Sequence, residues 1–185
     1  TGAKRTVTLS GVTTTEQFFS VPLTSFSGLN LALISSINLV VKNGEVPNAA
    51  TLAVRFGDIP YVPDIVSDPT LTAADISHLT GILQGLSFAS AAPNGIGTGT
   101  FNQSSTTQFT LAYDVTNANS FAGSIVTFDD YGTVAVESED LSAITNFVVG
   151  LSLSSGSGDV TLEFQDSTGA KRTVTLSGVT TTEQF

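Results

Sequence analysis

The acidic side chains between residues 129 and 140 are the densest group in this chain with the chemistry for metal binding or acid–base catalysis. Five carboxylates lie within twelve residues: Asp129, Asp130, Glu137, Glu139 and Asp140. Calcium prefers oxygen ligands of this kind, and glycoside hydrolysis needs two carboxylates facing each other across a cleft. On a strongly acidic chain, a solvated loop is the first interpretation, a weak calcium site the second and catalysis the last. We therefore expect calcium, if it binds, among these residues, with Asp58 as a further ligand.

The single histidine and a glycine-rich stretch are the other candidates for chemistry, and neither has the partners that it would need. His78 follows Ser77, but adjacent residues on a helix do not face each other, so they do not form a catalytic pair. The stretch Gly95 to Gly99 has no lysine after it, unlike a phosphate-binding loop. The chain has no cysteine, which excludes thiolate chemistry and disulfides. The sequence therefore predicts that the protein is not an enzyme.

The charge and hydropathy of the chain limit the classes of partner that we expect it to bind. Sixteen Asp and Glu stand against six Lys and Arg, which gives a net charge of −10. Such a chain repels nucleic acid and anionic membranes, and no apolar run approaches the roughly 20 residues of a membrane span. We therefore expect neither nucleic-acid binding nor membrane insertion. Acidic, threonine-rich, cysteine-free chains are common among microbial surface proteins, so we expect an extracellular or cell-surface location.

The elements that must position these side chains are strands, because alternation of polar and apolar residues dominates the chain. Thr51–Phe56, Gln108–Tyr113 and Asp159–Phe164 each alternate, which predicts strands with one face in a core. The apolar runs Ser36–Val41 and Phe147–Leu153 are typical of strands buried on both faces. Turn signals separate these runs at short intervals. The pattern predicts an all-β sandwich of two antiparallel sheets.

Two segments depart from the strand pattern. Residues 60–83 contain three prolines and predict a linker between domains. Short helices are expected at Thr72–Leu79 within that linker and at Ser138–Ala143.

The ends of the chain carry the same sequence. Residues 1–18 recur without a change as residues 168–185, so the two copies start 167 residues apart. The simplest source is a longer protein in which near-identical units of domain size follow one another. Long arrays of such units usually provide length, adhesion or assembly. The duplication therefore favours a structural or adhesive function.

The order of several short motifs resembles the galactose-binding-like jelly roll, which is used by many carbohydrate-binding modules. Read from Gln84 through the duplicated end and on into residues 19–59, the motifs are these: Thr110–Val115, Asn119–Gly123, Glu139–Ala143, Val160–Asp166, Phe19–Gly28, Ile34–Ile37 and Gly57–Ile59. The resemblance implies a jelly-roll sandwich whose boundaries are offset from the ends of this chain. Residues 1–59 would be the second half of one sandwich, 60–83 a linker, and 84–185 the first half of the next sandwich together with the start of its second half.

The expected function follows from the duplication and from this offset. Because Trp is absent and the three tyrosines are scattered, no aromatic platform for sugars can be named from the sequence. The preferred hypothesis is a structural or adhesive repeat of an extracellular fibre, sheath, surface layer or giant adhesin. Its partners would be copies of itself, joined head to tail by a shared strand, since Lys4–Leu9 and Lys171–Leu176 compete for one place beside Asp159–Asp166. The alternative is a carbohydrate-binding module that acts multivalently on extracellular glycans.

Overall fold

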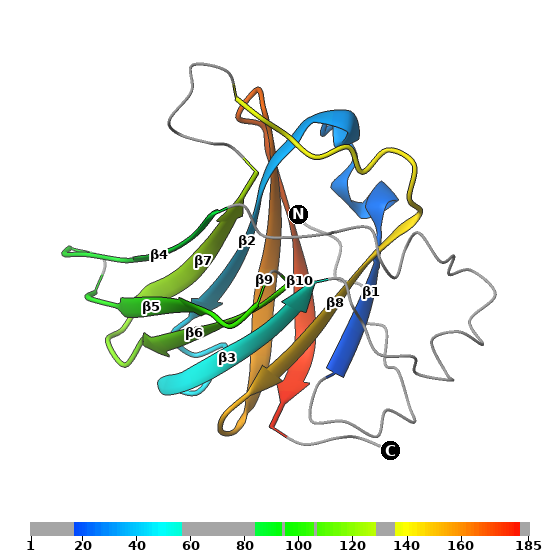
Figure 1. Cartoon of the computed structure of the whole chain (residues 1–185). Coiled ribbons are helices and arrows are strands. Elements are labelled where there is room, and N and C mark those ends of the chain that lie inside the picture. The colour runs from blue at the N-terminus through cyan, green and yellow to red at the C-terminus, as the bar shows by residue number, and fades with distance from the viewer. Residues whose placement is uncertain (1–16, 57–83, 94, 106, 129–135, 182–185) are drawn as a thin grey trace.

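The protein is a β-sandwich of two five-stranded antiparallel sheets (Figure 1). The computed structural model describes residues 17–56, 84–93, 95–105, 107–128 and 136–181. Its elements are β1 (Gln17–Pro22), the 3-10 turns η1 (Leu23–Phe26) and η2 (Leu31–Leu33), β2 (Ile34–Lys42), β3 (Ala49–Phe56), β4 (Gln84–Ala89), β5 (Thr98–Gln103), β6 (Gln108–Asp114), β7 (Phe121–Thr127), β8 (Asn146–Leu153), β9 (Ser157–Asp166) and β10 (Lys171–Thr180). The predicted all-β sandwich is confirmed.

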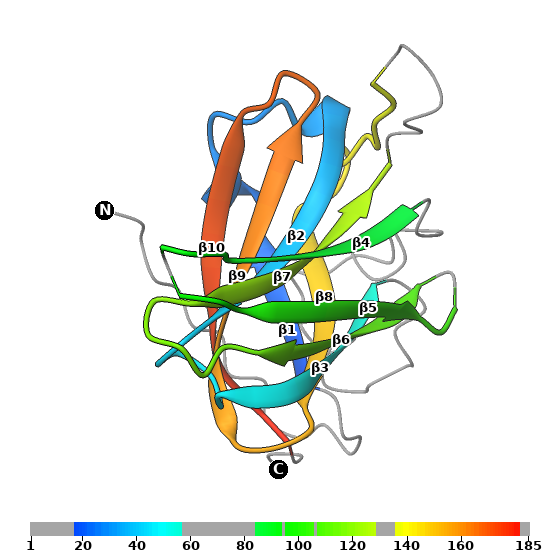
Figure 2. The same cartoon turned by 90° about the vertical axis from the view of Figure 1, so that its left-hand side faces the viewer.

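Both sheets place strands side by side that are far apart in the sequence. Sheet A has the order β1-β8-β3-β6-β5, and sheet B has the order β10-β9-β2-β7-β4. The strand β3 therefore pairs with both β8 and β6, and β2 pairs with both β9 and β7. Figure 2 shows sheet B with β10 at one edge and β9 and β2 beside it. Residues 17–56 and 84–180 thus build one core together.

The core lies between the sheets and is filled by the apolar phase of each strand. The alternating segment in β9 places Val160, Leu162 and Phe164 in the core with no exposed surface. Phe164 stacks on Phe26 with ring centroids 4.3 Å apart and meets the edge of Phe147 at 4.9 Å. The two apolar runs form β2 and β8, each with only one partly exposed residue before its last position. Both strands lie inside their sheets, each between two partner strands.

The expected helix at Ser138–Ala143 is wrong. Glu139 forms an isolated antiparallel bridge with Ile34, through hydrogen bonds of 3.0 and 2.8 Å between their backbones. The segment is held in extended form by this bridge and then turns at Ser142, whose amide donates to the Asp140 side chain. The tertiary pairing overrides the local signal. The other expected helix, Thr72–Leu79, lies outside the described residues, as does the linker 60–83.

Competition between the duplicated ends for one place allows two simple arrangements. Either the C-terminal copy is displaced and residues 1–58 fold back on their own chain, or the C-terminal copy is retained and residues 1–58 complete a neighbouring unit. In the structure β1, β2 and β3 pair within their own chain, and the C-terminal copy forms β10 at the same time. Only residues 4–13 compete for the β10 position, so residues 17–56 can fold back without displacing it. The division into offset domains stays a prediction for a longer protein.

Candidate functional site

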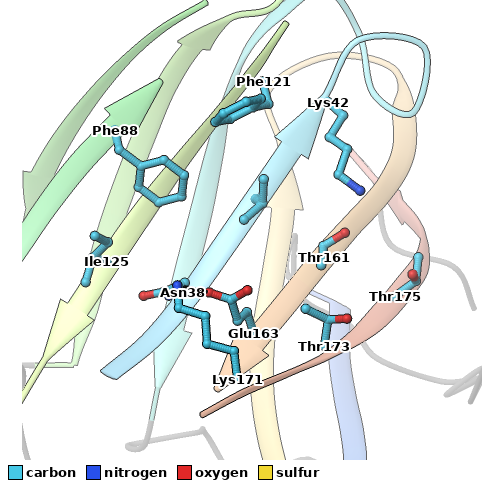
Figure 3. A pocket seen from close by; sticks show the side chains of 11 residues that line it. Asn38, Lys42, Phe88, Phe121, Ile125, Thr161, Glu163, Lys171, Thr173 and Thr175 are labelled. Atoms are coloured by element: carbon cyan, nitrogen blue, oxygen red, sulfur yellow. Dashed lines mark hydrogen bonds and ion pairs between the residues drawn. The ribbon is translucent and has the colours of Figure 1, made fainter. Parts of the chain in front are cut away.

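The outer face of sheet B is hollowed over its three central strands. Ile37, Leu39 and Val41 of β2 face the core, so the intervening residues of β2 face outward. Together with outward residues of the four other strands they line a depression of about 530 Å³. Its lining residues are Asn38, Val40, Lys42, Phe88, Phe121, Ile125, Thr161, Glu163, Lys171, Thr173 and Thr175 (Figure 3).

Two phenylalanines form one wall of this hollow. Phe88 on β4 and Phe121 on β7 are both partly exposed, and their ring centroids lie 6.3 Å apart. Phe88 lies opposite Gly123 in the β4–β7 register, and a Cβ at Gly123 would lie 2.3 Å from the Phe88 ring. The glycine therefore lets Phe88 rest against the strand instead of standing in solvent. Figure 3 shows both rings on one side of the hollow and the threonines of β9 and β10 on the other.

The floor of the hollow carries a short polar network. The Asn38 amide nitrogen donates to Glu163 Oε1 at 2.8 Å, and the Lys171 ammonium donates to the same oxygen at 2.9 Å. Because a carboxylate only accepts, the Asn38 nitrogen must face Glu163 and its oxygen must face away. Asn38 is only 4% exposed, and its buried amide oxygen has no hydrogen-bond partner among the described residues. A buried acceptor without a partner costs free energy in the folded state.

A second hollow continues the first along β2 and β9. It has a volume of about 380 Å³ and shares Asn38, Ile125 and Lys171 with its neighbour. Its far end is lined by the β9–β10 hairpin and by the side chain of Val136, which is 50% exposed. The unpaired amide oxygen therefore belongs to a residue that lines both hollows. The two hollows make an elongated trough and not a closed pocket.

The trough is close to neutral, although the chain is strongly acidic. Lys171 pairs with Glu163 at 2.9 Å, and Lys42 pairs with Glu45 at 3.6 Å. The remaining lining of the larger hollow is aromatic, aliphatic or hydroxyl-bearing. Neutral, partly apolar ligands with many hydroxyl groups match it best.

The acids singled out from the sequence are only partly described. Asp58, Asp129 and Asp130 lie outside the described residues. Glu139 is partly buried, and this burial, followed by the charge of Asp140, raises its pKa. Hydrogen bonds from Ser142 lower the pKa of the exposed Asp140.

Glu137 lies just before them in the same segment, ahead of β8. Within the described residues, no three His, Cys, Asp or Glu side chains gather as metal ligands would. Calcium binding stays a prediction. His78, Tyr61 and Tyr131 also lie outside the described residues, whereas Tyr113 lies in the core.

One buried acid was missed in the sequence. Asp166 at the end of β9 is 2% exposed. Its Oδ1 accepts from the Thr168 amide at 2.9 Å, the Thr168 hydroxyl at 2.6 Å and the Ala170 amide at 3.2 Å, while Oδ2 accepts from the Asn30 amide at 3.0 Å. These hydrogen bonds lower the pKa of Asp166. The Asp-Ser-Thr-Gly turn sequence was the available signal for this role.

Comparison with known protein families, curated proteins and solved structures finds no match to this chain. The two-sheet architecture is confirmed, whereas the resemblance to the galactose-binding-like jelly roll stays a prediction. None of the helices in the described part of the chain has the length and apolar character to cross a membrane.

Proposed function

We propose that this chain is an adhesive repeat domain of an extracellular protein and that the trough on sheet B binds a neutral carbohydrate chain. This proposal takes the alternative that the sequence placed second. The observation that carries it is the pair of partly exposed phenylalanine rings, Phe88 and Phe121, that form a wall of the trough beside its polar floor.

The aromatic wall supports the same ligand class. Phe88 and Phe121 present partly exposed rings beside the polar floor, and the C–H face of a pyranose can pack on such a ring. The threonines of β9 and β10 supply hydroxyl groups on the other side. A site with one apolar wall and a few convergent polar groups is typical of small-molecule recognition. An aromatic wall of phenylalanines replaces the Trp or Tyr platform that the sequence could not supply.

The shape of the trough favours a polymer over a monosaccharide. Two hollows of about 530 and 380 Å³ meet at Asn38, Ile125 and Lys171, and neither is enclosed. Open sites bury little of each sugar, so affinity per unit would be low. Repetition of the unit would then raise the overall affinity through effective concentration. Weak binding at many sites is the form of attachment that an adhesive array requires.

The experiment is electrophoresis through gels containing soluble neutral polysaccharides: a β-glucan, a xylan, a mannan and a galactan. We expect at least one polymer to retard the chain. The double variant Phe88→Ala/Phe121→Ala should migrate as it does without polymer. Thr110→Ala, on the partly exposed face of β6 in sheet A, is the matched control and should be retarded like the wild type. Thermal unfolding of each variant shows whether its fold is retained.

Two results would contradict the proposal. The first is that none of the four polymers, and no sugar on a wider glycan array, binds the chain. The second is that a polymer retards the folded double variant as strongly as the wild type, because binding would then occur elsewhere.

A purely structural repeat is the second candidate, and the identity of β10 with residues 4–13 favours it. In that case the chain would bind no sugar and would form regular filaments visible by electron microscopy. The two candidates are not exclusive, since an adhesive array needs both a joint between units and a surface that binds.

A further inference from the structure

The edge of sheet B beside β9 is a strand-binding site for which this chain carries two candidate strands. We propose that Lys4–Thr13 binds at the β10 position in place of Lys171–Thr180 of the same molecule. Residues 4–13 enter this argument through their sequence alone, which is identical to that of β10. The inference concerns which strand completes the edge of sheet B, and it does not depend on carbohydrate binding.

The apolar contacts of β10 can be reproduced by the N-terminal copy without a change. Val174, Leu176 and Val179 are 7%, 3% and 0% exposed and belong to the core. The corresponding residues of the other copy are Val7, Leu9 and Val12. Because the side chains are the same, the area buried and the shape of the packing are the same.

The polar and backbone features of the position are also duplicated. The register of β10 shifts between Leu176 and Val179, where Gly178 adopts a φ of +78°. Such a bulge needs a residue that tolerates positive φ, and Gly11 stands at the matching place. Lys171, which binds Glu163 at 2.9 Å, is matched by Lys4. The second copy therefore carries the side chain for the ion pair and the glycine for the bulge.

The chain path allows the N-terminal copy to reach the position. The Thr180 amide donates to Gln17 Oε1 at 2.7 Å, and Gln17 Nε2 donates to the Gly178 carbonyl at 3.2 Å. The end of β10 thus lies within a side chain's length of the start of β1. Thr13 precedes Gln17 by four residues, which span up to about 14 Å. A copy docked at the β10 position would continue directly into β1.

The same short connection explains why we infer exchange within one molecule. Only residues 14–16 separate the N-terminal copy from β1, and β1 is paired along its length with β8 of its own chain. A copy from a second molecule would have to bring its β1, β2 and β3 with it. Within one molecule, each copy is held near the site by a connection of three or four residues. The effective concentration is therefore high for both.

The contacts of the two copies are equal if Thr1 and Ala3 replace Thr168 and Ala170 at the Asp166 carboxylate, and the connections are of similar length, so both arrangements should be populated. A difference of about 1.4 kcal/mol would be needed to favour one copy tenfold. We therefore expect the ratio of the two arrangements to lie within about tenfold of unity.

Paired cysteines test this in the full chain, which has none of its own. Thr175 lies directly opposite Thr161 in the β10–β9 register, and Thr8 is the counterpart of Thr175. Facing residues on neighbouring strands are close enough for a disulfide after small adjustment. The control pair Thr175→Cys/Thr161→Cys should cross-link within the monomer. The pair Thr8→Cys/Thr161→Cys should do so as well, to a tenth or more of the control's yield under reversible oxidation.

A substitution in one copy should then shift the exchange. Leu176→Asp places a charge at a core position of β10, so the N-terminal copy should take over. The Thr8→Cys/Thr161→Cys cross-link should rise toward completion, and the chain should still unfold cooperatively. Leu9→Asp should abolish that cross-link without affecting the fold. The double variant Leu9→Asp/Leu176→Asp should lose the fold.

Three results would overturn the inference. One is the absence of the Thr8→Cys/Thr161→Cys cross-link while the control pair forms. Another is that this cross-link appears only between molecules, as dimers or ladders, which would instead support the head-to-tail assembly expected from the sequence. The last is that Leu176→Asp alone unfolds the chain as fully as the double variant does.

Discussion

Replacement of Asp166 by asparagine tests how the β9–β10 hairpin is held. The carboxylate accepts three hydrogen bonds on Oδ1 and one on Oδ2 from residues 168, 170 and 30. An amide oxygen can keep the first three as weaker, uncharged bonds, but its NH₂ group would then face the Asn30 amide, donor against donor. Charge-assisted bonds contribute about 1.5–3 kcal/mol each and neutral ones about half as much, so three weakened bonds and one lost bond should cost about 4 kcal/mol or more. For a domain of this size we expect the melting temperature to fall by at least roughly 8–16 °C.

The effect should depend on pH with a definite sign. The hydrogen bonds lower the pKa of Asp166 in the folded state, whereas the unfolded chain has the ordinary value near 3.9. The stabilisation is therefore complete above about pH 5. It is lost as the pH falls through the lowered pKa of the folded state. The gap in melting temperature between the wild type and Asp166→Asn should be constant from about pH 5 to 8 and should narrow below pH 4.

Asp114 provides a matched control because its carboxylate also accepts a turn hydrogen bond, from the Thr116 amide at 2.9 Å, but it is exposed. Asp114→Asn should change the melting temperature far less than Asp166→Asn does. The reasoning fails if Asp166→Asn is as stable as the wild type at pH 7. It also fails if the gap is as wide at pH 3 as at pH 7.

Three further predictions concern the core and calcium. Tyr113→Phe should leave the melting temperature unchanged or raise it by a few degrees, because the buried Tyr113 hydroxyl has no partner among the described residues. Burial raises the pKa of Tyr113 to about 12. The melting temperature of the wild type should therefore fall between pH 10 and 12 relative to that of Tyr113→Phe, which thermal unfolding at a series of pH values would show. Gly158→Ala should lower stability by about 1–3 kcal/mol, since the new Cβ would lie 2.4 Å from the Glu45 carbonyl oxygen; Ser157→Ala is the control in denaturant unfolding. If calcium binds, millimolar calcium should raise the melting temperature above that in chelator, and equal values would remove that prediction.

Much of the fold follows from period-two alternation, because one face of each strand meets a common core. The alternating segments at residues 159–164, 108–113 and 51–56 lie within β9, β6 and β3. Sheet order did not follow in the same way. β2 is inserted between β9 and β7, and each residue pair that it forms with them is at least 79 residues apart in the sequence. Local alternation does not indicate which distant strand a given strand will pair with.

The phenylalanines show where sequence reasoning about the site stops. Seven of them, Phe18, Phe26, Phe56, Phe109, Phe128, Phe147 and Phe164, are buried. Phe121 falls on the opposite phase of β7, because its neighbour Ala122 faces the core. That phase was a readable sign of an outward aromatic. The acids at 129–140 are adjacent in the sequence, whereas the side chains of the trough become neighbours only in the folded sheet.

The position of the trough depends on the register of the strands in sheet B as well as on their order. Phase tells which side chains face outward on each strand, but register decides which of them meet. Phe88 lies opposite Gly123 and not opposite a side chain that would lift its ring away from the sheet. Asn38 lies opposite Glu163 on one side and Ile125 on the other, so one end of its amide is bonded and the other is left against an apolar neighbour. A shift of β2 by one residue would turn Asn38 into the core and Leu39 into solvent. The core therefore fixes the register, and the unpaired oxygen at the floor of the trough follows from it.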